Sequence, residues 1–376
     1  MSGEKRAADQ SFGSAQLVKR QRSNGNINGG ALIQANGAGT VVSDALLGPE
    51  SFRQRAERQF QGRQLIRMYA QGLQAPVMEL SGHSGEVFCA RFDPSGQCIA
   101  SGSMDRNVLL WRTSGECDNY GVLSGHKSAI LDLHWSRDSQ VVYTASADKT
   151  VASFNVETGE RIRRYVGHEE VINCLDVSKR GEEFLVSGSD DGSISIWDPR
   201  RKEALEYIQS DFPVTAIALS EAGNELFSGG IDNEIKVWDL RMKKVQYTLK
   251  GHTDTITSLE ISPDAQLLLS NSHDSTVRTW DVRPFAPTDR AMKTLDGAQA
   301  GLEKNLIQSC WDSEGKRVAG GGGDGTVTIW NSKDGRMLHK LPGHKGTVND
   351  VRISPDGSMI LSASTDRTML LGELPR

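Results

Sequence analysis

Residues 84–112 read SGEVFCARFDPSGQCIASGSMDRNVLLWR and directly follow the pair Gly82-His83. Apolar residues alternate along three short stretches, which predicts strands at Val87–Phe92, Cys98–Gly102 and Val108–Trp111. The segments between them, Pro-Ser-Gly and Met-Asp-Arg-Asn, have the residue types that form turns. This part of the chain is therefore expected to be an antiparallel sheet of short strands.

The same pattern recurs along the chain. Gly-His pairs stand at five places, and their histidines are 43, 42, 84 and 92 residues apart, the last two intervals being double periods. A second series, Trp-Asp or a near relative, occurs seven times, and six residues before each member stands an aspartate: Asp105, Asp148, Asp191, Asp232, Asp274, Asp324 or Asp366. A fourth strand precedes each Gly-His, as at Lys244–Leu249. Seven such units predict a seven-bladed β-propeller, an all-β fold.

The combination of Gly-His, aspartate and Trp-Asp resembles the WD-repeat family over residues 76–374. The resemblance implies that the strand Val77–Leu80 joins the last three strands of the chain, so that the final blade is built from both ends. Such closure removes the unpaired sheet edges that template aggregation. The predicted organisation is a disordered tail over residues 1–72 and a WD-repeat propeller over residues 73–376.

The resemblance also implies a buried hydrogen-bonded chain of histidine, serine or threonine, aspartate and tryptophan in each blade. A buried carboxylate is tolerable only with such partners. In the first three blades the chain maps to His83, Ser101, Asp105 and Trp111, to His126, Thr144, Asp148 and Phe154, and to His168, Ser187, Asp191 and Trp197. Phe154 has no N–H to donate. The fourth unit has Gln209-Ser210 in place of Gly-His and the sixth has no histidine, so these two blades are expected to be less firmly tied.

Charge is unevenly distributed between the tail and the body. Residues 1–72 hold ten Lys and Arg against five Asp and Glu, whereas the rest holds 33 basic and 43 acidic residues. An acidic body disfavours nucleic-acid binding through phosphate neutralisation. Two basic clusters in the tail predict a bipartite nuclear localisation signal, which an import receptor reads; a solvated basic tail is the alternative. The clusters are Lys5 with Arg6, and Lys19, Arg20 and Arg22.

The rest of the tail has two kinds of composition. Residues 23–48 are rich in Gly, Asn and Ala, cannot bury a core, and are expected to be disordered. Residues 51–69 interleave five arginines with large apolar side chains. That segment either folds on an RNA or protein partner or serves as a plain tether.

No pattern in the sequence predicts catalysis, a metal, a cofactor, a small-molecule substrate or a membrane span. Five of the eight histidines belong to the repeat, and the five cysteines form no CxxC, which predicts free, mostly buried thiols. The string at residues 320–325, GGGGDG, formally matches GxGxxG, but it leads into a strand instead of opening a helix. It occupies the place of a turn in other units and is expected to be a β-turn.

Strand alternation predicts where partners bind. The residue four past each Gly-His histidine, such as Val87, is apolar and should face the core, as should Val214 and Leu306 by alignment. Its neighbours must then point the other way. In WD-repeat propellers these neighbours and the residue before the turn aspartate line the top face around the channel: Phe88, Met104, Leu131, Val171, Asp190, Pro213, Ile231, His273 and Ile307. Few Lys or Arg are expected there, which favours a protein or peptide partner over RNA; single exposed hydrophobic residues of no consequence are the alternative.

Several strings resemble one branch of the family, the WD-repeat subunits of the spliceosomal U5 small nuclear ribonucleoprotein. They are Gln74–Met78, Cys117–Tyr120, Gly229–Arg241, Asp281–Pro287, Glu303–Leu306 and Val18–Arg22. The resemblance implies a nuclear, non-catalytic scaffold of pre-mRNA splicing. It would be bound to the large U5 scaffold protein with its helicase and GTPase, and associated with U5 RNA indirectly.

The alternative function is that of a substrate receptor of a cullin-type ubiquitin ligase. Trp-Asp-x-Arg, a pattern associated with docking to that ligase's adaptor, occurs at residues 197–200, 238–241 and 280–283. The pattern is weak, because arginine is common just past this strand.

Overall fold

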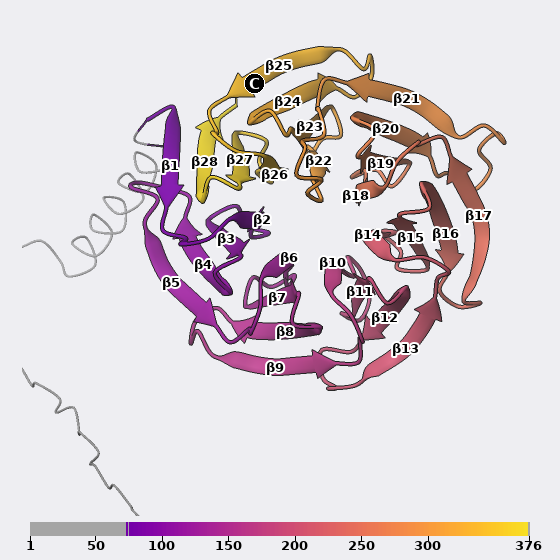
Figure 1. Cartoon of the computed structure of the whole chain (residues 1–376), viewed down its shortest axis with the longest axis horizontal. Helices are drawn as coiled ribbons and strands as arrows, with labels where there is room; N and C mark the ends of the chain where they lie inside the picture. Colours follow the sequence, from indigo (N-terminus) through magenta and orange to yellow (C-terminus); the bar gives the residue numbers. More distant parts are fainter. Residues whose placement is uncertain (1–72, 74, 375–376) are drawn as a thin grey trace, which may run out of the picture. The chain divides into compact units, whose positions relative to one another are not determined.

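The computed structural model describes residue 73 and residues 75–374. Within them, strands β1 to β28 form seven four-stranded antiparallel sheets arranged as the blades of a ring (Figure 1). The predicted seven-bladed propeller is confirmed. In this part of the chain no helix has the length and apolar character needed to cross a bilayer. The predicted nuclear localisation signal and the arginine-rich segment 51–69 lie outside the described residues.

The first three blades begin at β2 and continue in chain order. They comprise β2 (Val87–Phe92), β3 (Cys98–Ser103), β4 (Asn107–Arg112) and β5 (Asn119–Ser124); β6 (Ile130–Trp135), β7 (Val141–Ser146), β8 (Thr150–Asn155) and β9 (Arg161–Val166); and β10 (Ile172–Val177), β11 (Leu185–Ser189), β12 (Ser193–Trp197) and β13 (Ala204–Gln209). The predicted strands of the first unit are each present, extended by no more than a residue at either end.

Blades four to six repeat the arrangement. They comprise β14 (Val214–Leu219), β15 (Glu225–Gly230), β16 (Glu234–Asp239) and β17 (Lys244–Lys250); β18 (Ile256–Ile261), β19 (Leu267–Ser272), β20 (Thr276–Asp281) and β21 (Ala291–Asp296); and β22 (Ser309–Trp311), β23 (Arg317–Gly321), β24 (Thr326–Asn331) and β25 (Met337–Pro342). Gly320 and Gly321 of the GGGGDG string end β23, and residues 322–325 form the predicted turn that leads into β24.

The seventh blade closes the ring with strands from both ends of the described chain. Its strand order is β1-β28-β27-β26, with β1 at Val77–Ser81, β26 at Val348–Ile353, β27 at Met359–Ser364 and β28 at Thr368–Glu373. β1 runs antiparallel to β28, with Val77 opposite Gly372 and Ser81 opposite Thr368 (Figure 1). The predicted closure by the N-terminal strand is confirmed.

The hydrophobic core lies between successive blades. One cluster, for example, packs Val108, Leu110 and Leu123 of blade one against Ile130 and Leu133 of blade two. The apolar residue four past each Gly-His histidine is buried in every blade that has the motif. The cysteines are free, four of them buried and Cys98 half-buried, as predicted.

Blade six departs from the alignment by one residue. In the other six blades the first strand has a register shift just past its core residue, as between Val87 and Cys89, whereas β22 has none. The carbonyl of Ile307 accepts a hydrogen bond from Thr257 Oγ1 at 2.8 Å, as the carbonyl of Val87 does from Asn349 Nδ2. Ile307 therefore occupies the core position, and the prediction that it lines the top face, with Leu306 in the core, is wrong.

Candidate functional site

Each complete repeat motif forms a hydrogen-bonded chain that ties one blade together. In blade one, His83 Nδ1 lies 2.9 Å from Asp105 Oδ2, and His83 Nε2 lies 2.7 Å from Ser101 Oγ. Trp111 Nε1 donates to the same Ser101 Oγ at 2.9 Å. If Nδ1 carries the proton and donates to the carboxylate, Nε2 accepts from the serine hydroxyl, so every group has a partner. The predicted chain is confirmed.

Blades two and three carry the same chain. His126 bonds Asp148 at 3.0 Å and Thr144 at 2.6 Å, and Phe154 replaces the indole donor with a ring 5.9 Å from the imidazole. In blade three, His168 lies 3.2 Å from Asp191 and 2.7 Å from Ser187, which also accepts from Trp197 Nε1 at 2.8 Å. His252 and His344 make the corresponding contacts in blades five and seven.

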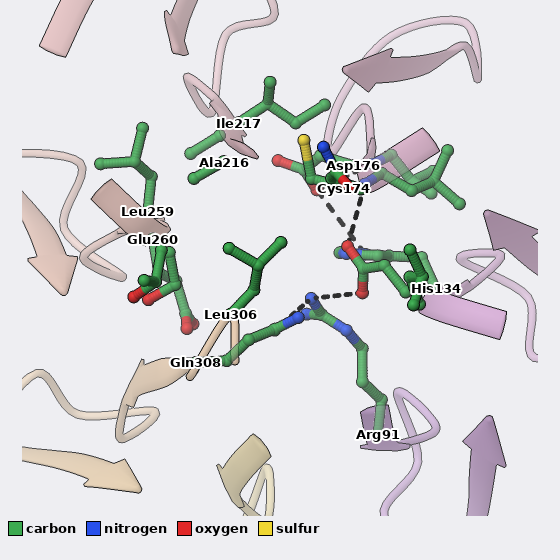
Figure 2. A pocket seen from close by; sticks show the side chains of 18 of the residues that line it. Arg91, His134, Cys174, Asp176, Ala216, Ile217, Leu259, Glu260, Leu306 and Gln308 are labelled. Carbon is green, nitrogen blue, oxygen red and sulfur yellow. Dashed lines mark hydrogen bonds and ion pairs between the residues drawn. The ribbon is translucent and has the colours of Figure 1, made fainter. Parts of the chain in front are cut away.

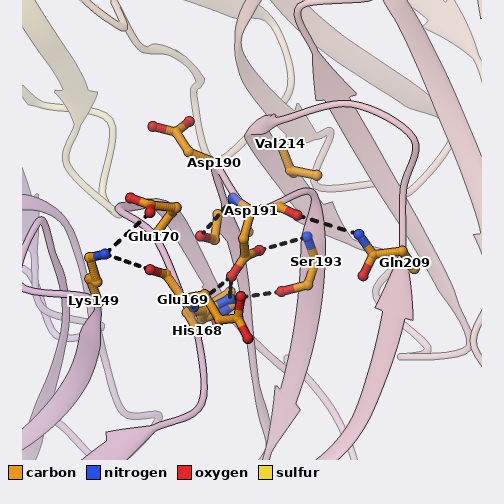
Figure 3. A network of polar contacts seen from close by, with 12 residues as sticks. Lys149, His168, Glu169, Glu170, Asp190, Asp191, Ser193, Gln209 and Val214 are labelled. Carbon is orange, nitrogen blue, oxygen red and sulfur yellow. Dashed lines mark hydrogen bonds and ion pairs between the residues drawn. The ribbon is translucent and has the colours of Figure 1, made fainter.

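The aspartates of these chains also fix the loops of the top face, defined here as the face that carries the Gly-His loops. Asp191 Oδ2 accepts from the backbone N–H of Glu169, and Asp191 Oδ1 from that of Ser193 (Figure 3). Burial raises the pKa of Asp191, but these hydrogen bonds and His168 outweigh it and lower the pKa to about 2. Burial lowers the pKa of His168, which keeps the imidazole neutral at pH 7.

Blade four replaces the missing histidine with a lysine. Asp232 Oδ2 lies 2.7 Å from Lys236 Nζ, and both side chains are largely buried. Trp238 Nε1 still donates to Ser228 Oγ at 2.8 Å. In blade six, Trp330 Nε1 donates instead to the carbonyl of Asp296 at 2.9 Å.

The residues predicted to bind partners do not share one environment. Met104 and Ile231 are 57% and 48% exposed, and Asp190 is exposed too. Ile307 is only 3% exposed, for the reason given above. The rest of the predicted set is half-buried: Phe88, Leu131, Val171, Pro213 and His273. Of these, Phe88 and Leu131 line the central channel, while His273 Nε2 lies 3.0 Å from the carbonyl oxygen of Asn305.

The channel holds a cavity of about 450 Å³ that first strands from six blades and the Lys304–Leu306 segment line. Figure 2 shows Leu306 and Gln308 in its wall, opposite His134 and Asp176. The expectation that few cations surround the channel is wrong. Five line this cavity: Arg91, Arg137, Lys179, Lys304 and Arg352.

Carboxylates neutralise the arginines at the middle of the channel. Arg352 Nη1 lies 3.0 Å from Glu260 Oε2, and Arg91 Nη2 lies 3.3 Å from Asp132 Oδ1. Arg352 Nε approaches Asp350 Oδ1 to 2.9 Å as an ion pair, without the alignment of a hydrogen bond. Burial raises the pKa of Glu260 and of Asp350 despite these arginines. The arginines at the middle of the channel are therefore paired and do not present a free positive charge to phosphate. Among the described residues, no ion pair involves Lys179 or Lys304, which also line the cavity.

The sequence contains a signal for the polar side chains that surround the channel. The residue four past the core residue of the first strand is polar in five blades: Arg91, His134, Asp176, Glu260 and Arg352. The register shift just past the core residue reverses the alternation of the strand, so the side chain at this position faces the channel in all five blades. Sequence reasoning considered the core residue and its immediate neighbours only and so missed these polar side chains.

Side chains near the channel also tie neighbouring blades to one another. Asp132 Oδ2 accepts from the backbone N–H of Leu175 in the next blade at 2.9 Å, and Asp350 Oδ2 from that of Ala90 at 2.9 Å. Asp176 Oδ2 accepts from the N–H of Leu219 at 2.8 Å. These bonds tie three pairs of neighbouring blades to one another beside the channel.

Comparison with known proteins identifies relatives across the propeller. The WD domain, G-beta repeat model matches residues 74–112, 292–331 and 335–371, and the model of the nucleolar protein 10-like N-terminal domain matches residues 127–299. Pre-mRNA-splicing factor cwf17 of Schizosaccharomyces pombe is 48% identical over 302 residues, which cover 80% of this chain and 88% of that protein. The U5 small nuclear ribonucleoprotein 40 kDa proteins of Mus musculus and Homo sapiens are 46% and 45% identical over 302 residues, 80% of this chain and 84% and 85% of theirs.

This chain belongs to the U5 40 kDa protein family. Members of this WD-repeat family match the chain over about four-fifths of its length, a share close to the extent of the described propeller. The resemblance of the chain to this branch of the WD-repeat family is thereby confirmed.

Proposed function

We propose that the chain is a non-catalytic protein-interaction scaffold of pre-mRNA splicing and a component of the U5 small nuclear ribonucleoprotein. The observation that carries the proposal is the identity of 45–48% with U5 40 kDa proteins and cwf17 over 302 residues. The top-face loops that the repeat aspartates fix, and the hydrogen bonds between blades, support a role in binding other proteins.

The proposed partners are spliceosomal proteins, in particular the large U5 scaffold protein with its helicase and GTPase. Association with U5 RNA is indirect, because the arginines at the middle of the channel are paired with carboxylates and the body carries a net negative charge. The protein acts in the nucleus, and an import receptor reads Lys5, Arg6 and Lys19–Arg22.

The docking pattern for a cullin adaptor has less support. Arg283, in the third Trp-Asp-x-Arg sequence, binds its own Asp281 through two guanidinium nitrogens, with Nη2 at 2.6 Å from Oδ2. Arg200 and Arg241 are exposed, as arginines at a turn commonly are. The splicing function is therefore preferred.

Affinity purification of the full chain from nuclear extract tests the proposal. We expect U5 RNA and the large U5 proteins to be recovered together, and the proteins to remain bound after ribonuclease treatment. Recovery of a cullin adaptor without U5 components, or loss of all proteins with the RNA, would overturn it.

A further inference from the structure

The top corner of blade four is built differently from those of the histidine-bearing blades. Lys236, which replaces the histidine as the partner of Asp232, also places Nζ 5.4 Å from the centroid of the Phe212 ring. A cation over an aromatic face attracts the ring electrostatically. The lysine therefore holds Phe212 in place, although the ring is 46% exposed.

Phe212 belongs to a small apolar surface, the blade-four patch, which consists of Phe212, Pro213 and Ile231. The turn that carries Ile231 lies directly against the loop that carries Pro213, since a Cβ added at Gly230 would stand 2.3 Å from the Pro213 carbonyl oxygen. Phe212 and Ile231 are both about half exposed. Exposed aromatic and aliphatic side chains held in fixed positions are typical of the residues that dominate protein interfaces.

Carboxylates border this patch. Asp211 precedes Phe212 and is exposed. Asp190 of blade three is exposed too, and Asn173 Nδ2 binds both its Oδ1, at 2.6 Å, and the carbonyl of Val214 at 3.1 Å, which fixes it against blade four.

The two carboxylates lack cationic partners of their own. Lys149 pairs with Glu170 at 3.3 Å, and Figure 3 shows Asp190 pointing away from that pair. Across residues 75–374 no ion pair involves Asp190 or Asp211. The border is therefore negative and unneutralised.

We propose that the blade-four patch binds a short segment of a partner protein that combines a large apolar side chain with a neighbouring arginine or lysine. The apolar side chain packs on Phe212 and Ile231, and the cation lies between Asp190 and Asp211. Nucleic acid is disfavoured at this corner, because its phosphates would meet two unpaired carboxylates. The inference rests on the proposed function and adds to it the place and the chemistry of one contact.

Blade one supplies a matched control. Met104 stands at the same turn position as Ile231, one residue before the repeat aspartate, and is 57% exposed. Its turn also carries the exposed Arg106, where the corresponding turn of blade four has Asn233. Exposure of an apolar side chain at this turn is thus shared, whereas Ser84 and Thr365 stand at the positions that correspond to Asp211 and Asp190.

The test places the photo-crosslinking amino acid p-benzoylphenylalanine at Ile231 or, as control, at Met104 of the full chain in nuclear extract. We expect position 231 to crosslink to a splicing protein, in a segment with arginine or lysine within a few residues of a large apolar side chain. Asp190→Asn with Asp211→Asn should lower the yield at position 231 about threefold or more, since two ion pairs are lost. Glu203→Gln, which removes an exposed carboxylate between β12 and β13, should leave the yield unchanged.

Crosslinking to RNA, crosslinking to an acidic segment, or a crosslinking yield that does not change when the two aspartates are replaced would overturn the inference. Equal crosslinking of one segment from positions 231 and 104 would also do so. If position 231 crosslinks to nothing while the chain still copurifies with U5 proteins, this inference fails and the proposed function stands. If the unsubstituted chain recovers no U5 proteins, the proposed function itself fails.

Discussion

Replacing Asp191 by alanine should lower the free energy of unfolding by about 1–3 kcal/mol at pH 7, because it removes the acceptor for three groups. These groups are the N–H of Ser193 at 2.7 Å, the N–H of Glu169 at 2.9 Å and His168 Nδ1 at 3.2 Å. Water can replace the carboxylate at the two backbone groups, which lie near the surface. The His168 imidazole is buried, so the loss of its hydrogen-bond acceptor sets the size of the destabilisation.

Ser193 limits the destabilisation that Asp191→Ala causes. Its Oγ lies 2.9 Å from His168 Nδ1 and can serve as acceptor once the carboxylate is gone. Ser193→Ala alone should therefore change stability by less than about 0.5 kcal/mol, whereas the double variant leaves the imidazole without a partner. The double variant should be destabilised by about 1 kcal/mol more than the sum of the single variants.

Urea denaturation of the full chain, followed by circular dichroism, measures these differences. Glu203→Ala is the control, since this carboxylate is exposed between β12 and β13 and its loss should change stability by less than about 0.5 kcal/mol. A loss at Asp191→Ala no greater than at Glu203→Ala, or strict additivity of the double variant, would refute the reasoning.

The pH dependence provides a second check on the same variant. The pKa of Asp191 is about 2 in the folded chain against an ordinary value of 3.8, so the unfolded chain binds the proton more readily between these values. Its contribution to stability is present above about pH 4 and is lost as the pH falls through 2. The difference in the free energy of unfolding between the unsubstituted chain and Asp191→Ala should become smaller as the pH falls over that range.

Further predictions concern the N-terminal tail, the pairing of β1 with β28, the ion pair of Lys236 with Asp232, and the predicted partner-binding residues Phe88 and Ile231. Deleting residues 1–22 should leave the unfolding midpoint unchanged but reduce nuclear accumulation of a fluorescent fusion, provided that import with a bound partner is blocked. Deleting residues 73–81 should lower the midpoint far more, because β28 loses its neighbour. Lys236→Met should cost about 1.5–3 kcal/mol in urea denaturation by leaving Asp232 without its ammonium. The double variant Phe88→Ala, Ile231→Ala should fold normally yet lose a splicing protein in pull-down; recovery of the full set would place the contacts elsewhere on the ring.

The features that recur in every blade could be predicted from the sequence. The features in which one blade differs from the others could not. The strands follow from spacings that recur along the chain, and the closure at Val77 and the histidine–aspartate chains follow from the resemblance to the WD-repeat family. The position of Ile307 could not be predicted, because alignment assumes a register shift that β22 lacks. That Lys236 replaces the histidine as the partner of Asp232 could not be predicted either, because this pairing depends on side-chain geometry in one blade.

The pairing of β1 with β28 has a consequence for synthesis of the protein. Val77 leaves the ribosome almost 300 residues before its partner Gly372, which at 5–20 residues per second is a delay of roughly 15–60 s. Throughout that interval β1 has no sheet to join, and blade one lacks blade seven, against which it packs in the closed ring. The nascent ring thus remains an open arc until its last strand emerges, and it is in this state that a chaperone would have most to protect.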